Sequence, residues 1–253
     1  MASHAIIHGL NYENFPNARL HGCDTDAHRL EKLVSQYVDS VETHTEYNQN
    51  TGVRIVDRLH HIADWTQKEN VETVIISFSG HGVRSQGTEN ICPSDFRANG
   101  TITDKHLHEI LCKFHEKTTV YLIMDCCHSG DILNLRYRWV IDNNDCTCTR
   151  PSVGFASENE CYTKPEALCI SLSGCRKEET SADAYNVLDE GKFGGALTSC
   201  LVEHLESLNE IDELPTVFHL VRCINKKIHK KEFDQTPVLS SNIKLCDNHQ
   251  IFS

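Results

Sequence analysis

Short apolar runs alternate with amphipathic, helix-like segments along most of the chain. Strand-like runs occupy residues 5–9, 71–78, 120–124 and 167–173. Segments with apolar residues on one helical face occupy residues 24–37, 51–65, 103–117, 194–207 and 213–227. This alternation predicts an α/β fold, a three-layer sandwich in which helices cover both faces of a mainly parallel central sheet. We expect residues 237–241 to close the sheet as an edge strand.

The stretch from residue 135 to residue 166 has no such period. Charged residues, Asn143-Asn144, Pro151 and Gly154 follow one another there without a sustained hydrophobic pattern. We therefore predict a long surface loop that joins the two ordered parts of the chain.

Composition describes an ordinary globular protein, since 39% of the 253 residues are hydrophobic and 24% are charged. No apolar run approaches the roughly 20 residues of a membrane helix, and the first residues do not resemble a signal peptide. We expect a cytoplasmic, intracellular protein without a membrane partner, in which most of the 13 cysteines are reduced. The net charge of −12 disfavours a nucleic-acid partner and favours cationic substrates, although it also simply increases solubility.

Two of the strand-like runs end in segments that contain reactive residues. Ser79-Gly80-His81-Gly82 follows the second run, and Asp125-Cys126-Cys127-His128-Ser129-Gly130 follows the third. Neighbouring parallel strands would bring the histidine and a cysteine to the same edge of the sheet. A thiolate nucleophile and an imidazole base need this juxtaposition. The spacing from His81 to Cys127 is also close to the roughly 50 residues of caspase-type signatures.

The chain resembles the metacaspases, which are caspase-related cysteine peptidases. The resemblance rests on segments in family order, at residues 79–82, 91–95, 125–130, 173–175, 180–184, 194–198 and 235–241. It implies a single caspase-like peptidase domain over residues 1–253, without a prodomain. The large-subunit-like part would cover residues 1–134, the linker loop residues 135–166, and the small-subunit-like part residues 167–253.

The resemblance assigns the nucleophile to Cys127 and the base to His81. The residues alone leave both Cys126 and Cys127 open, although alternation at an extended strand end sends neighbouring side chains to opposite sides. An inert buried thiol is the other interpretation of Cys127, but it does not explain the Ser-Gly-His-Gly segment. By the same resemblance, the main-chain amides of Gly82 and Cys127 would form the oxyanion hole.

Substrate preference follows from the acids that the resemblance places in the S1 pocket. These are Asp26, within Gly22-Cys23-Asp24-Thr25-Asp26-Ala27, and Asp125, with Ser79 lining the same pocket. Two carboxylates suit a guanidinium or ammonium group, so the resemblance implies protein or peptide substrates cleaved after Arg or Lys. Taken alone, Asp26 would be a first-turn acid favoured by the helix dipole, and Asp24 is expected to be the N-cap.

The calcium site of many metacaspases is degenerate in this chain. Four aspartates of the family pattern correspond here to Asp95, Asp104, Lys105 and Asn134, so two acids remain. Calcium requires several anionic oxygens, and lysine supplies none. We predict that no cofactor is required and that calcium dependence is weak or absent.

We predict a monomeric cysteine endopeptidase that acts through a thioester acyl-enzyme. Exposed loops are where proteases cut, so the basic residues of the 135–166 segment are candidate self-cleavage positions: Arg136, Arg138, Arg150 and Lys164. One alternative is a catalytically weak caspase homologue that acts as a regulatory binding module. Another is a redox-sensing protein built on the vicinal cysteines Cys126 and Cys127.

Overall fold

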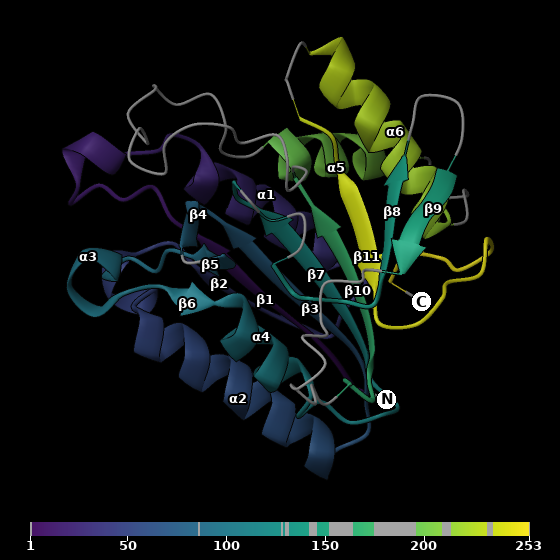
Figure 1. Ribbon diagram of the computed structural model, residues 1–253, viewed down its shortest axis with the longest axis horizontal. Helices are drawn as coiled ribbons and strands as arrows, with labels where there is room; N and C mark the ends of the chain where they lie inside the picture. Colours follow the sequence, from purple (N-terminus) through teal and green to yellow (C-terminus); the bar gives the residue numbers. More distant parts are fainter. Residues whose placement is uncertain are drawn as a thin grey trace.

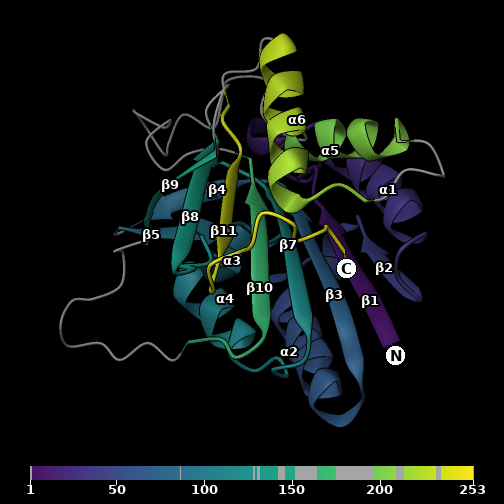
Figure 2. The same ribbon diagram turned by 90° about the vertical axis from the view of Figure 1, so that its right-hand side faces the viewer.

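An eight-stranded sheet forms the middle layer of the molecule, and helices cover both of its faces (Figures 1 and 2). The structure, a computed structural model, describes residues 2–85, 87–127, 129, 132–141, 146–151, 164–174, 196–208, 214–231 and 235–252. The strand order is β2-β1-β3-β7-β10-β11-β8-β9. The predicted α/β sandwich with a mainly parallel central sheet is therefore confirmed.

The parallel part of the sheet contains the strands that precede the candidate site. Its members are β2 (Ser40–His44), β1 (Ala2–Gly9), β3 (Val71–Ser79), β7 (Thr119–Asp125) and β10 (Leu168–Ser173). The antiparallel part consists of β11 (Val238–Ser241), β8 (Tyr137–Ile141) and β9 (Cys146–Pro151). A separate small sheet is formed by β4 (Gly82–Ser85), β5 (Thr88–Ile91) and β6 (Ile102–Thr103).

The helices divide between the two faces of the large sheet. One face carries α1 (Cys23–Val34), α5 (Ala196–Glu206) and α6 (Val217–Lys230), and the other carries α2 (Gly52–Lys68) and α4 (Asp104–Leu111) (Figure 1). A short α3 (Phe96–Asn99) and two 3-10 turns (Pro16–Ala18 and Tyr47–Gln49) lie in the connections. Of the helices in the described ranges, none is long and apolar enough to cross a membrane.

The central strands are apolar throughout because both of their faces are buried. In β3, Ile75 packs in the core under α1, α5 and α6, whereas the next residue, Ile76, packs in the core under α2 and α4. Tyr121 and Leu122 of β7 divide in the same way. Burial of each such side chain stabilises the fold by roughly 1.5–3 kcal/mol, which keeps the strand ends in place for the site.

The prediction of a surface loop over residues 135–166 is wrong for residues 137–141 and 146–151, which form β8 and β9. Trp139 is 3% exposed, and its ring packs edge-on against Phe218 of α6 at a centroid distance of 5.6 Å. Strand β8 has only five residues, and one of them is charged. Its hydrophobic alternation is therefore too short to be recognised from the sequence. Residues 142–145 and 152–163 lie outside the described residues.

The prediction that residues 237–241 form an edge strand is also wrong. β11 pairs with β10 on one side and with β8 on the other. Pro237 lies just before the first residue of the strand, so its missing N–H interrupts no ladder bond. The predicted 103–117 helix is shorter than expected, because α4 ends at Leu111.

Candidate active site

The carboxyl ends of β3 and β7 place the site at one edge of the parallel sheet. Ser79 and Asp125, the last residues of the two strands, are partners in the parallel ladder. Gly9, at the end of β1, pairs with Ser79 from the other side. His81 and Cys127 each follow two residues after these strand ends. This register brings the histidine motif and the cysteine motif to the same edge of the sheet, as the sequence predicts.

The imidazole of His81 is held by the loop between β1 and α1. Its Nε2 lies 2.7 Å from the carbonyl oxygen of Ala18. Because a carbonyl oxygen only accepts hydrogen bonds, Nε2 carries the proton and Nδ1 keeps its lone pair. The side chain is largely buried, and burial lowers the pKa of His81 below its ordinary value, with the Ala18 hydrogen bond opposing the shift. A neutral imidazole with a free acceptor nitrogen can act as a general base.

Tyr12 anchors the same histidine through the main chain. Its hydroxyl donates to the carbonyl oxygen of Cys92 at 2.6 Å and accepts the main-chain N–H of His81 at 2.9 Å. The tyrosine ring lies 4.6 Å from the imidazole, centroid to centroid. Tyr12 has a φ of 54°, which is unusual for a bulky residue. Tyr12 and Ala18 could not be predicted from the sequence, because a contact between distant loops leaves no local pattern.

The vicinal cysteines point to different environments. Cys126 is 3% exposed and belongs to the core under α2 and α4, whereas Cys127 is partly exposed. This is the arrangement that strand alternation predicts, and it leaves Cys127 as the accessible thiol. Nearby Cys92 is a poor nucleophile, because burial and the charge of Cys127 raise its pKa to about 12.

Gly82 brings the histidine segment against the cysteine segment. A Cβ atom at position 82 would lie 1.9 Å from the carbonyl oxygen of Cys127, so only glycine fits there. The main chains of the two predicted oxyanion-hole residues are therefore in contact. Which amides point at a substrate carbonyl stays a prediction.

Burial raises the pKa of both predicted S1 acids, and the charge of Asp125 also acts on Asp26. Asp125 is 1% exposed, and burial raises its pKa, although its Oδ2 accepts the N–H of Thr198 in the first turn of α5 at 2.7 Å. Burial, followed by the charge of Asp125, raises the pKa of Asp26 to about 7. Ser79, which is 2% exposed, ends the strand beside them. Two mutually repelling carboxylates in a buried place would be relieved by a cation.

Arg29 is the protein's own cation beside this pair. Its guanidinium lies 4.0 Å from Oδ1 of Asp26 and 3.7 Å from the carboxylate of Glu206, and it donates to Oγ of Ser199 at 3.4 Å. The charge of Arg29 lowers the pKa of Asp26 and offsets part of the effect of Asp125. Because the guanidinium is about one-third exposed, water screens this attraction.

Asp24 is not the N-cap of α1, which corrects the prediction. The N-cap is Gly22, with a φ of 109°, and the helix begins at Cys23. Asp24 therefore lies inside the first turn, where its Oδ1 accepts the N–H of Thr25 at 2.7 Å.

The residues at the degenerate calcium positions have structural partners. Asp95 accepts the N–H of Gly52 at 2.8 Å through Oδ1 and the side-chain amide of Asn99 at 2.7 Å through Oδ2. Asp104 accepts the N–H of Lys105 at 2.5 Å. The Lys105 side chain is exposed, and Asn134 has a φ of 55°. Within the described ranges, neither aspartate belongs to a group of three potential metal ligands.

The basic residues of the 135–166 segment lie in different surroundings. Arg138 is in β8, where its main chain pairs with Ser240 and with Arg150 of β9. Arg136 is exposed just before that strand, and Lys164 is exposed in coil just before β10. A peptide bond held in a sheet is protected from proteolysis, so Arg136 and Lys164 are the more accessible of the four predicted positions.

Comparison with known proteins assigns the family. The family model described as caspase domain matches residues 3–246. The chain belongs to the caspase domain family. Metacaspase-3 of Trypanosoma brucei brucei is 27% identical over 98% of this chain and 73% of its own length. The same organism's inactive metacaspase-4 is 26% identical over 95% of this chain and 72% of its own length.

A solved structure gives the same fold. A crystal structure of a Geobacter sulfurreducens protein superposes with a TM-score of 0.63, covering 97% of this chain and 95% of that one at 19% sequence identity. The recognition as a metacaspase-like member of the caspase family is thus confirmed, and with it a place among the cysteine peptidases and their homologues.

Proposed function

We propose that this protein is a cysteine endopeptidase in which Cys127 attacks the scissile carbonyl and His81 is the base. The observation that carries the proposal is the fixed tautomer of His81, because the Ala18 carbonyl leaves Nδ1 free to take the thiol proton. The thiolate forms a thioester with the acyl group, and the imidazolium returns its proton to the leaving amine. Water then hydrolyses the thioester with His81 again as the base.

The proposed preference is for Arg or Lys at P1. It is supported by the raised pKa of Asp26 and of Asp125, which mark a place where added positive charge is favourable. An acidic P1 side chain would add a third carboxylate to this pocket at a cost of several kcal/mol. Arg29 lies on the Asp26 side and would share that carboxylate with the substrate.

The regulatory binding module is the second candidate. It is favoured by one observation, the 26% identity to an inactive metacaspase. Such a protein would bind partners through the same cleft without turnover. Measurement of turnover therefore distinguishes the two candidates.

The test is hydrolysis of short fluorogenic peptides that end in Arg, Lys or Asp. We expect the Arg and Lys peptides to be cleaved, and Cys127→Ala to abolish cleavage because it removes the attacking sulfur. Cys126→Ala is the matched control, because it removes a neighbouring core thiol, and it should keep a substantial part of the activity. Equal losses in two folded variants would overturn the assignment, and absence of turnover in the unmodified chain would favour the binding module.

The same samples report on self-cleavage. Fragments should appear on storage of the unmodified chain and be absent from Cys127→Ala. Mass spectrometry should place the new ends after Arg136 or Lys164 rather than after Arg138. Fragments that also form in the Cys127→Ala sample would come from another protease.

A further inference from the structure

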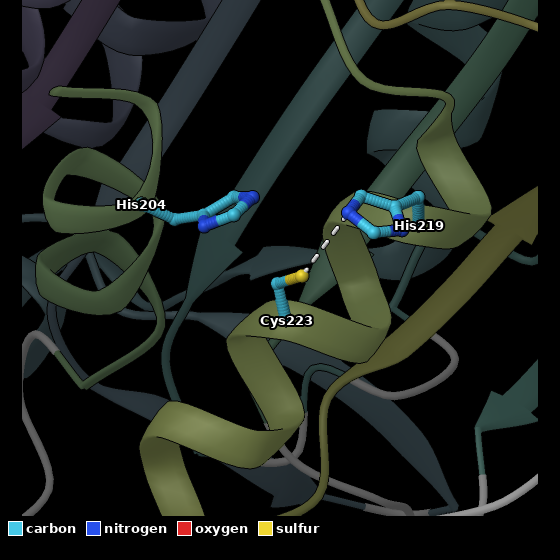
Figure 3. Close-up of side chains that lie close together, drawn as sticks. All are labelled: His204, His219 and Cys223. Atoms are coloured by element: carbon cyan, nitrogen blue, oxygen red, sulfur yellow. Dashed lines mark hydrogen bonds between the residues drawn. The ribbon is translucent and has the colours of Figure 1, made fainter. Parts of the chain in front are cut away.

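A group of soft metal ligands lies between α5 and α6, separate from the histidine and cysteine of the candidate active site. Figure 3 shows His204 of α5 pointing toward His219 and Cys223, which come from α6. His219 and Cys223 are four residues apart and so share one face of their helix. Within the described residues, these three are the one group of His, Cys, Asp or Glu whose ligand atoms all lie within 4.8 Å of one another.

One of the ligand separations already matches that of a bound metal ion. The sulfur of Cys223 lies 3.4 Å from Nε2 of His219. In a tetrahedral zinc site, a sulfur and an imidazole nitrogen are about 3.5 Å apart, and two such nitrogens are about 3.3 Å apart. The longest separation, 4.8 Å at most, would have to shorten by about 1.5 Å.

His204 has a nitrogen that lacks a partner. Its Nε2 is buried and has no hydrogen bond within the described structure. Burial, together with the charges of Lys227 and His219, lowers the pKa of His204 below its ordinary value. An imidazole nitrogen that carries no proton can bind a metal ion. An unsatisfied buried nitrogen normally costs stability, which a bound ion would restore.

The surrounding charges act in two directions. Burial raises the pKa of Cys223, and the charges of Lys226 and Lys227 offset part of that rise. The two lysines favour the thiolate form, but they also repel a bound cation. Glu203, next to His204, is paired with Lys231 at 2.5 Å, an ion pair that already joins α5 to α6. We therefore expect a site of moderate affinity rather than a tight Cys₄-type site.

We propose that His204, His219 and Cys223 bind one zinc ion, with water as the fourth ligand, and that this ion clamps α5 to α6. On binding, the Cys223 thiol releases its proton to solvent, the two imidazoles stay neutral, and no electron is transferred. The first turn of α5 holds Asp125 through the N–H of Thr198. The ion would therefore stiffen the helix that supports the pocket without touching the candidate catalytic residues.

The test uses the full chain with His81→Ala and Cys127→Ala, so that the candidate catalytic pair cannot bind the metal. Titration with cobalt should give a thiolate-to-cobalt charge-transfer band that saturates at one ion per chain, and zinc should displace the cobalt. Zinc should also raise the melting temperature, because it binds the folded state. His219→Ala, at an exposed position, should weaken binding by at least about tenfold, and Cys223→Ser should remove the charge-transfer band.

Two further variants in the same background are matched controls. Cys246→Ser changes an exposed cysteine and His229→Ala a histidine of the same helix, and both should keep the band and the thermal shift. The proposal is overturned if Cys223→Ser keeps the band, or if the parent binds no cobalt at one equivalent. Because His219 is exposed, circular dichroism should show that its variant is folded, so a loss of binding is a loss of the ligand.

Discussion

Two pairs of aspartates in this protein have the same side chain but different surroundings. Partial burial, followed by the charge of Asp125, raises the pKa of Asp26 to about 7, and Asp125 itself is 1% exposed. Asp95 and Asp104 are also buried, and each accepts a main-chain N–H, while Asp95 accepts the side-chain amide of Asn99 as well. In the first pair, the Thr198 N–H and the charge of Arg29 offset the raised pKa values only in part, whereas hydrogen bonds hold the carboxylates of the second pair.

The difference separates a ligand pocket from a structural contact. Asp95 accepts the N–H of Gly52 at the start of α2, where the N-cap residue Thr51 makes no side-chain bond of its own. Asp95 therefore caps the N-terminus of α2, although it lies 43 positions away from Gly52 in the sequence. A carboxylate used in this way has less to offer a calcium ion, whereas the pair at the sheet edge favours a cation.

The largest effect is expected from neutralising the pocket. Asp26→Asn should lower kcat/KM for Arg peptides by about 30- to 1000-fold, since loss of a charged partner costs about 2–4 kcal/mol. The matched control is Asp24→Asn, two residues earlier in the same turn, which should change kcat/KM little. Steady-state kinetics on Arg peptides decides the matter. If both variants behave alike, Asp26 is only a first-turn acid.

Removing the carboxylate of Asp95, which belongs to the hydrogen-bonded pair, should lower stability instead. Asp95→Ala removes the acceptor for Gly52 and Asn99 and should cost about 1–2 kcal/mol, or roughly 3–6 °C in melting temperature. Below the melting range, kcat/KM for Arg peptides should stay within about twofold. Thermal denaturation and kinetics on one preparation provide both numbers. A loss of activity without a loss of stability would move Asp95 into the catalytic machinery.

A third expectation concerns pH. With a pKa of about 7, Asp26 is protonated below neutrality, so KM for Arg peptides should fall several-fold as pH rises through 7. In Asp26→Asn this change should vanish, while the acid limb set by His81, whose pKa is lower than usual, should remain. An unchanged KM profile in the variant would exclude Asp26 as the titrating group.

The same group makes an opposite contribution to stability. Because the folded-state pKa of Asp26 lies above its ordinary value of 3.8, its protonated form stabilises the fold at low pH. That contribution is complete below about pH 3.8 and is lost as pH rises through 7. Asp26→Asn should therefore gain stability relative to the unmodified chain above pH 7, as denaturant titrations at two pH values would show.

The smallest effect is expected from calcium. A chelator should change activity by less than about twofold, because two of the four family acids are Lys105 and Asn134. The double change Lys105→Asp with Asn134→Asp tests whether restored charge installs a calcium response. A chelator that silences the unmodified chain, with recovery specific to calcium, would show that other oxygens build a site.

The position of Ser79 and Asp125 was predictable because strand ends are local features, whereas Asp26 came only from the family resemblance and its pocket role stays a prediction. The apolar runs before Ser79 and Asp125 predicted two neighbouring parallel strands, and the register pairs these two residues directly. The core faces of the first helices were predictable for the same reason, since Leu30 and Ile55 follow helical spacing and are buried.

Other features depend on contacts between distant segments. Strand β8 is stabilised by the packing of Trp139 against Phe218 of α6. Because β8 pairs with β11, β11 is an internal strand of the sheet. The hydrogen bonds that join His81 to Tyr12 and Ala18 connect residues more than 60 positions apart in the sequence. None of these has a periodic signal in the stretch where the residue lies, so hydrophobic spacing could not reveal them.

The hydrogen bond from His81 to the Ala18 carbonyl depends on the main chain of a loop, so substitutions and deletions in that loop should affect it differently. Every amino acid offers a carbonyl oxygen, so replacement of the alanine side chain leaves the acceptor in place. Deletion of one residue between Leu10 and Gly22 would instead move that oxygen by up to about 3.8 Å. The orientation of the imidazole is thus encoded in the length of a loop rather than in the identity of a residue.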